Sequence, residues 1–241
     1  ASDVYKRQGM VIKNTEVTAD NLTTSGNAWG GINVDNAGNP KLTLSNPSIV
    51  EPVQVWTELT NVLEGTITID NEDFIPVAGE GSSTDSTGLK GFIYYTTDPA
   101  KLGEASIEKD GKITVYSTLE NALEKSAAED TITLLKDVQV EDAISIAKSL
   151  TINGNQKTIT YAPSTAAGDA KDKANFITVT ASNVTIQDAT IDAEGAKNAV
   201  HFYLVTGGML DSVTVKGGAY TSVLVNGSAV TVKDSVMNPN T

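Results

Sequence analysis

The sequence contains no cysteine and a single arginine, Arg7, among its 241 residues. The absence of cysteine excludes disulfide bridges, thiol catalysis and cysteine-ligated zinc, and the scarcity of arginine removes most chemistry that needs a guanidinium group. No apolar run approaches the roughly 18 residues of a membrane-spanning helix. Thirty acidic against 17 basic residues give a formal net charge of −13, which disfavours a polyanionic partner. We therefore predict neither nucleic-acid binding nor membrane insertion for these residues.

The two ends of the sequence do not read as natural chain ends. Residues 1–8 lack the charged and apolar regions of a signal peptide, and the run from Ser2 to Gln8 resembles translated sequencing-adapter read-through at the edge of a metagenomic gene fragment. The other end stops just after a repeat motif. We expect residues 1–8 to be an artefact or disordered, and the rest to come from the interior of a longer chain.

A six-residue pattern recurs along the chain: an apolar residue, any residue, Asn, Asp or Ser, any two residues, and a second apolar residue. Its central positions are Asn14, Asn46 and Asn71 in the first half and Asp188, Ser212 and Asp234 in the second. The two apolar ends are separated by an odd number of positions, so in a straight strand they would lie on opposite faces. Both can face one core only if the chain bends at the central residue, where Asn, Asp and Ser tolerate a left-handed backbone. We expect equivalent corners at these positions within each half.

Apolar positions in the second half are spaced as in a solenoid. They are Ile132, Ile152, Ile186, Leu210 and Val232, at intervals of 20, 34, 24 and 22 residues. The long interval contains the polar stretch 162–173, which fits a loop inserted at one corner. Strand-type alternation at such a period predicts an all-β fold of stacked coils with these five side chains facing inward.

A short helix is expected near residues 118–128. Ser117 is the predicted N-cap and Glu120 completes a capping box. Leu119, Ala122 and Leu123 form an apolar stripe that would cover the open end of the first coil.

Three segments divide the chain. We assign residues 9–78 to the C-terminal coils of a first β-helix and 79–111 to a linker and a hairpin turned at Asp110-Gly111. Residues 112–241 form the N-terminal cap and the coils of a second, truncated β-helix.

The runs Val115–Leu123, Asp130–Val138 and Ser149–Asn155 resemble the opening of pectin-lyase-like right-handed parallel β-helices. They are most similar to the non-enzymatic versions found in large bacterial cell-surface proteins. This resemblance implies a right-handed parallel β-helix (solenoid) in a secreted or cell-surface protein. It says less about function, because the same scaffold hosts lyases, hydrolases and adhesins.

Enzymes of that family imply what a catalytic site would contain. Similar pectate lyases use carboxylate-bound calcium with a catalytic Arg or Lys, and similar polygalacturonases use clustered aspartates, a Gly-His-Gly and an Arg-Ile-Lys. The sequence shows neither set. Its single histidine, His201, alternates with Val200, Phe202 and Leu204, which puts it on the outer face with Tyr203 and without a visible orienting partner. We assign no catalytic residue and predict that the chain is not an enzyme.

Acidic residues gather at three places. They are Asp70, Glu72 and Asp73; Asp169 and Asp172; and Asp188, Asp192 and Glu194. Carboxylates are hard ligands for calcium, but none of these groups has the spacing of a known calcium loop, and turns collect Asp for conformational reasons. We therefore assign no metal site and expect no cofactor. Calcium is the one ion that these acidic groups could still bind.

Trp29, in a glycine-rich turn, and Trp56, predicted to point outward in phase with Gln54, are the candidate ligand-binding residues. Exposed tryptophan stacks on sugar rings, although a tryptophan folded over a neighbouring coil is the alternative.

We expect a structural or adhesive repeat segment of an extracellular or cell-surface bacterial protein that contacts a surface glycan or a host or matrix partner. The alternative is a polysaccharide lyase or hydrolase of the same fold whose catalytic coils are missing or unrecognised. The high negative charge would repel an anionic polysaccharide unless calcium intervened.

Overall fold

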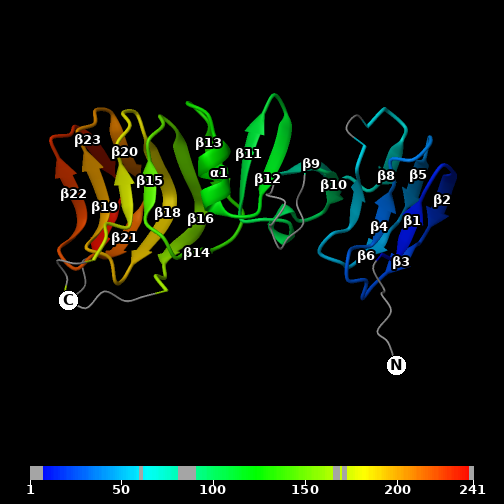
Figure 1. The fold of residues 1–241 in the computed structure, drawn as a ribbon, viewed down its shortest axis with the longest axis horizontal. Coiled ribbons are helices and arrows are strands. Elements are labelled where there is room, and N and C mark those ends of the chain that lie inside the picture. Colours follow the sequence, from blue (N-terminus) through cyan, green and yellow to red (C-terminus); the bar gives the residue numbers. More distant parts are fainter. Residues whose placement is uncertain (1–7, 60–61, 81–90, 165–168, 170–172, 239–241) are drawn as a thin grey trace. The chain divides into compact units, whose positions relative to one another are not determined.

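The computed structural model describes residues 8–59, 62–80, 91–164, 169 and 173–238. Strands make up 50% of the protein and helix only 5%. Most of the strands belong to stacked parallel coils, about 9 turns in all, which is the β-solenoid architecture of a parallel β-helix (Figure 1). The predicted all-β solenoid is confirmed, whereas residues 1–7 of the predicted artefact lie outside the described residues.

The chain divides into two compact units. Unit 1 contains Ala1–Gly103 and Glu108–Ser117, and unit 2 contains Glu104–Ile107 and Thr118–Thr241. Most of the polar stretch predicted as a linker, residues 81–88, lies outside the described residues. The predicted hairpin turn is present, with positive φ at both Asp110 and Gly111, as a tight hairpin turn requires.

Unit 1 begins with parallel coils and continues into antiparallel strands. Its sheets have the orders β1-β4-β7-β10-β9-β12, β2-β5-β8 and β3-β6, with β10 antiparallel to both β7 and β9. Its elements are β1 (Met10–Ile12), β2 (Glu16–Asp20), β3 (Thr23–Thr24), β4 (Ile32–Val34), β5 (Lys41–Ser45), β6 (Ser48–Ile49), β7 (Val55–Thr57), β8 (Ile67–Asp70), β9 (Ile75–Glu80), β10 (Ile93–Thr96), the 3₁₀ helix η1 (Pro99–Lys101) and β12 (Lys112–Tyr116).

One corner of unit 1 is lined by asparagine. The register of β2, β5 and β8 places Asn21, Asn46 and Asn71 at equivalent positions just after each strand. Asn14 instead joins β1 to β2, so its predicted equivalence to Asn46 is wrong, because each coil has more than one corner that fits the pattern. Asn14, Asn21 and Asn46 have φ values of 50°, 52° and 48°. Asn71 opens a different turn, in which its Oδ1 accepts from the main-chain N of Asp73 at 2.9 Å.

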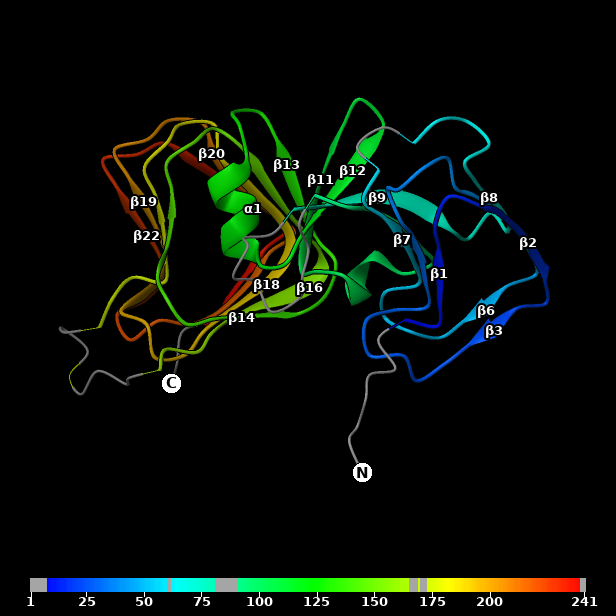
Figure 2. The same cartoon turned by 45° about the vertical axis from the view of Figure 1, so that its right-hand side comes forward.

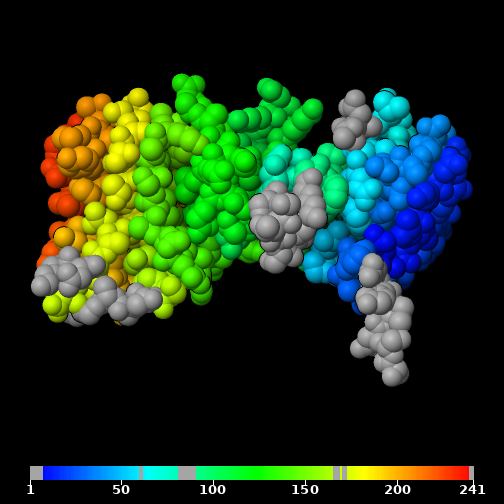
Figure 3. Space-filling model, viewed as in Figure 1, coloured from blue at the N-terminus to red at the C-terminus, as the bar shows by residue number. Residues whose placement is uncertain are grey.

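Unit 2 is built mainly from parallel coils of two or three strands, and successive coils appear as adjacent bands of colour from green to red in the space-filling view (Figure 3). Its elements are β11 (Ala105–Lys109), of which residues 105–107 belong to unit 2, α1 (Leu119–Lys125), β13 (Thr131–Leu134), β14 (Val138–Val140), β15 (Ile144–Ile146), β16 (Thr151–Tyr161), β17 (Ile177–Val179), β18 (Thr185–Ala193), β19 (Asn198–Tyr203), β20 (Gly208–Asp211), β21 (Thr214–Gly217), β22 (Thr221–Asn226), β23 (Val230–Lys233) and β24 (Val236–Asn238).

A ladder of aliphatic side chains runs through five coils of unit 2. Ile132, Ile152, Ile186, Leu210 and Val232 face one another in strict succession. The first four are fully buried, as predicted. Val232 keeps the inward register that the sequence predicts, although 49% of this residue is exposed. The ladder is intact there, but Val232 belongs to the last described coil and no described strand covers it.

The corners predicted for the second half are confirmed. Asp188, Ser212 and Asp234 follow three residues that pair with one another across β18, β20 and β23. Their φ values are 50°, 57° and 49°. The six-residue pattern therefore marks a backbone bend that recurs at one position in successive coils.

Helix α1 begins one residue later than the sequence predicts and is shorter than the predicted 118–128. Its N-cap is Thr118, whose side chain accepts from the main-chain N of Asn121 at 3.2 Å. The predicted N-cap, Ser117, is buried instead. The two hydroxyl residues are adjacent, so the sequence pattern fits both, and packing decides between them.

Helix α1 lies against the first coil of unit 2 (Figure 2), where apolar packing and Lys148 hold it. Leu119 and Ala122 are fully buried, and the Nζ of Lys148 donates to three main-chain oxygens at the C-terminal end of the helix, the nearest that of Ser126 at 2.7 Å. The predicted cap of the coil is thus a single helix of seven residues. None of the helices in the described residues is long and apolar enough to cross a membrane.

Candidate functional site

Strand β19 carries the only histidine of the sequence. Val200 and Phe202 are fully buried, whereas His201 is half-buried and Tyr203 is 44% exposed, so the predicted alternation holds within the strand. The prediction that Leu204 faces inward is wrong, because the backbone leaves the strand there with a φ of 55° and the residue is 65% exposed.

A chain of hydrogen bonds orients the His201 ring across three coils. Thr221 Oγ1 donates to Asn198 Oδ1 at 2.9 Å, Asn198 Nδ2 donates to Asn175 Oδ1 at 2.7 Å, and Asn175 Nδ2 donates to His201 Nδ1 at 3.1 Å. The prediction that His201 lacks an orienting partner is therefore wrong. The partner lies 26 positions earlier in the sequence, beyond the reach of a local motif.

This network makes His201 a poor general base. Because Nδ1 accepts a hydrogen bond, the proton of the neutral ring is on Nε2. Nε2 is buried and has no partner among the described residues, and burial lowers the pKa of the ring. The lone pair that would take a proton is already occupied, so the geometry fixes the ring in place rather than presenting it to a substrate.

The two candidate tryptophans have different surroundings. The Trp56 ring packs on Phe92, with centroids 5.1 Å apart, and its Nε1 is buried without a partner among the described residues. Trp29 is 52% exposed in the turn before β4. Of the two tryptophans, Trp29 is the more exposed.

Gln54 does not share the outward orientation predicted for it and Trp56. It is buried, its Nε2 donates to the main-chain oxygen of Ile49 at 2.9 Å, and its Oε1 accepts from the main-chain N of Thr97 at 2.7 Å. These bonds satisfy the amide inside unit 1, which removes the cost of burying it.

Unit 1 also contains a buried carboxylate that the sequence does not reveal. Glu51 is only 3% exposed and accepts from Thr24 Oγ1 at 2.6 Å and from Asn27 Nδ2 at 2.5 Å. Burial raises the pKa of Glu51, but the hydrogen bonds from Thr24 and Asn27 outweigh it and hold the pKa below its ordinary value. Both donors come from the preceding coil, so no local pattern points to this site.

Two carboxylates of the predicted acidic groups lie at turns. Asp188 occupies a corner, Asp192 Oδ1 accepts from the main-chain N of Glu194 at 3.4 Å, and Asp172 lies outside the described residues. Lys216 faces Asp192 on the neighbouring coil. Within the described ranges, no three His, Asp or Glu side chains gather where they could hold a metal ion.

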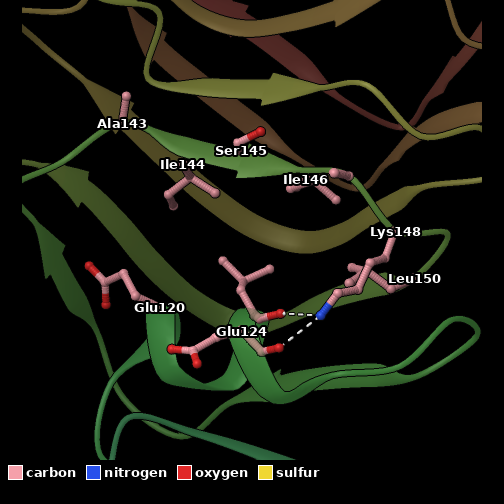
Figure 4. A pocket seen from close by; sticks show the side chains of 10 residues that line it. Glu120, Glu124, Ala143, Ile144, Ser145, Ile146, Lys148 and Leu150 are labelled. Atoms are coloured by element: carbon pink, nitrogen blue, oxygen red, sulfur yellow. Dashed lines mark hydrogen bonds between the residues drawn. The ribbon is translucent and has the colours of Figure 1, made fainter.

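Two open grooves lie beside strand edges, one in each unit. The α1–β15 groove of unit 2 has a volume of about 450 Å³ (Figure 4), and the β8 groove of unit 1 has about 420 Å³. The first is lined by Glu120, Leu123, Glu124, Ala143, Ile144, Ser145, Ile146, Ala147, Lys148 and Leu150. The second is lined by Val62, Leu63, Glu64, Gly65, Ile67, Thr68, Ile69, Phe74 and Tyr95. Neither groove includes a tryptophan.

The sequence could have indicated only part of the first groove. Glu120 and Glu124 are spaced one helical turn apart, which places both on one face of the predicted helix. The opposite wall is a strand edge, and which edges lack a partner follows from pairing between distant segments.

Comparison with known proteins places the chain in no family: no protein-family model, no curated protein and no solved structure matches it. The resemblance to pectin-lyase-like proteins is therefore supported at the level of the β-helical fold alone.

Proposed function

We propose that this chain is a structural or adhesive repeat segment of a secreted or cell-surface bacterial protein. The observation that supports it most is the in-register stacking of unit 2, in which one aliphatic ladder passes through five successive coils. A scaffold of this kind is rigid along its stacking direction because each coil is bonded to its neighbours by main-chain hydrogen bonds.

The outer faces supply regularly spaced polar positions. Thr131, Thr151 and Thr185 lie side by side on three coils. The residue that follows each threonine in its strand faces inward and is fully buried, namely Ile132, Ile152 and Ile186. Such a surface presents side chains at the spacing of β-strands, which suits display to an extended partner. The net charge of −13 keeps such a surface soluble and hydrated.

Trp29 is the residue we assign to contact with a surface glycan or a matrix partner. Its indole is half-exposed, and the face of an aromatic ring stacks on the apolar face of a sugar. Trp56 is secondary in this proposal because it is less exposed than Trp29.

A glycan array tests the proposal with the whole chain, in buffer with calcium and in buffer with a chelator. We expect binding to a subset of glycans that is lost in Trp29→Ala and retained in the matched variant Tyr220→Ala, which removes another half-exposed aromatic residue. Binding that both variants retain would remove Trp29 from the contact.

The enzymatic alternative is tested on the same preparation. A panel of polysaccharides is incubated with the chain, and new reducing ends and unsaturated products are measured with and without calcium. Turnover by the parent chain that is abolished in His201→Ala, while this variant keeps its circular dichroism spectrum, would overturn the structural role.

A further inference from the structure

The outer edge of β15 has no strand beside it within the described part of the chain. β15 is the end strand of the sheet β15-β17-β19-β22. On the β17 side, the main-chain N of Ile144 donates to Phe176 at 2.7 Å, and Ile146 accepts from Thr180 at 2.9 Å. Since successive residues of a strand direct their main-chain groups to opposite sides, the N–H and C=O of Ser145 point away from β17. An unpaired edge of this kind is a template for another strand.

Helix α1 turns this edge into a groove. Ile144 extends from β15 towards the helix (Figure 4), and the half-buried Leu123 faces it from α1. The Nζ of Lys148 is bonded to main-chain oxygens of the helix (Figure 4), which sets the distance between the two walls. The groove therefore combines a hydrogen-bonding edge with an apolar wall, the combination that binds an extended peptide.

The rim of the α1–β15 groove is acidic. Glu120 and Glu124 line it and are both exposed. Lys125 lies 3.7 Å from Glu124 and offsets part of its charge, whereas Glu120 has no such partner among the described residues. Lys148, the one cation of the lining, directs its Nζ to three main-chain oxygens. A basic side chain complements this rim.

We propose that the α1–β15 groove binds an extended, basic peptide segment of a partner protein, which adds to β15 as a further strand and places a lysine or arginine beside Glu120 and Glu124. A second copy of this chain is disfavoured as the occupant, because the net charge of −13 makes two copies repel each other.

Binding of fluorescein-labelled peptides to the whole chain, measured by fluorescence anisotropy, tests the proposal. The probes are a short peptide of alternating valine and lysine and a matched peptide of alternating valine and glutamate. We expect the basic probe to bind roughly tenfold more tightly or better, equivalent to about 1.4 kcal/mol. Equal affinity for the two probes would overturn the assignment of a basic partner.

Ser145→Pro tests strand addition. Its N–H faces the groove, so proline removes a donor to the added strand without removing one from the ladder with β17. We expect roughly tenfold weaker binding, while Ser145→Ala, which keeps the N–H, binds like the parent chain. A Ser145→Pro variant that keeps its circular dichroism spectrum and its affinity would overturn the proposal.

Leu123→Arg provides the same test if Ser145→Pro does not fold. It places a cation in the groove at a half-buried position, and we expect it to abolish binding of the basic probe. Unchanged binding would overturn the proposal.

The double variant Glu120→Gln/Glu124→Gln separates the rim from the diffuse charge of the chain. We expect it to weaken binding of the basic probe about two- to fivefold. The control Glu108→Gln/Glu194→Gln removes the same charge from exposed positions outside the groove and should bind normally. Equal loss in both variants would show attraction to the net charge alone and overturn the groove as the site.

Sedimentation velocity of the chain without probe tests whether a second copy of the chain occupies the groove. A dimer that is abolished in Ser145→Pro would mean that a second copy fills the groove, and this outcome too would contradict the proposal.

Discussion

The Nζ of Lys148 lies 2.7 Å from the main-chain oxygen of Ser126, the C-cap residue of α1. This contact joins a residue that follows β15 to the end of a helix more than 20 positions earlier. The Nζ of Lys148 also donates to the main-chain oxygens of Leu123 and Glu124. It thereby satisfies carbonyl groups that have no main-chain partner at the end of the helix and places a positive charge at the negative end of the helix dipole.

Lys148→Met should therefore loosen the cap of unit 2. We expect the free energy of unfolding, measured by urea denaturation followed by circular dichroism, to fall by roughly 1–3 kcal/mol. Lys216→Met, which removes an exposed lysine, is the matched control and should change stability by less than about 0.5 kcal/mol. Equal effects of the two variants would show that the bonds to α1 add nothing.

Glu51→Gln should destabilise unit 1 at neutral pH by roughly 1–3 kcal/mol, because an amide nitrogen replaces an oxygen that accepts from Thr24 or Asn27. The pKa of Glu51 is lowered in the folded state. The stabilisation is thus present above the ordinary glutamate pKa and is lost as the pH falls through the folded value.

Thermal unfolding of the parent chain and of Glu51→Gln from neutral to acidic pH checks both statements. The difference in midpoint should shrink as the pH falls. Glu72→Gln, at an exposed position, is the control, and its unfolding midpoint should stay close to that of the parent chain at every pH. A midpoint difference for Glu51→Gln that does not change with pH would mean that the negative charge of Glu51 does not stabilise unit 1.

Two positions of the same ladder should respond differently to truncation. Leu210 is fully buried and Val232, its neighbour in register, is half-exposed. Leu210→Ala should cost roughly 2–5 kcal/mol and Val232→Ala less than about 1 kcal/mol, as measured by chemical denaturation. Comparable losses would mean that a partner already covers the last described coil in solution.

That ladder was readable in the sequence because the period and the alternation of apolar residues both follow from the geometry of a coil. The corner at Asn21 was also visible in principle, since Asn21, Asn46 and Asn71 are each 25 positions apart. Asn14 fits the six-residue pattern, and only the pairing of the strands shows that Asn14 and Asn21 lie at different corners.

The functional surfaces were less accessible to prediction. Glu51 and Gln54 are polar residues whose burial depends on partners in other segments of unit 1. The orientation of His201 likewise depends on Asn175, which lies across a coil boundary. The α1–β15 groove arises where a predicted helix meets a strand edge whose lack of a partner no local pattern encodes.

The corner at Ser212 provides the last prediction. Its φ of 57° is unfavourable for a β-branched residue, whose Cβ clashes with the following carbonyl in the left-handed region. Ser212→Val should lower the free energy of unfolding by roughly 1–2 kcal/mol, whereas Ser212→Gly should be close to neutral. The same replacement in a strand, Ser145→Val, should be neutral or stabilising, because β-branched residues suit extended backbone. Chemical denaturation of the three variants distinguishes backbone strain from the simple loss of a hydroxyl, since the loss of the hydroxyl is common to all of them. A Ser212→Gly variant as unstable as Ser212→Val would mean that the serine side chain, rather than the left-handed backbone, holds this corner.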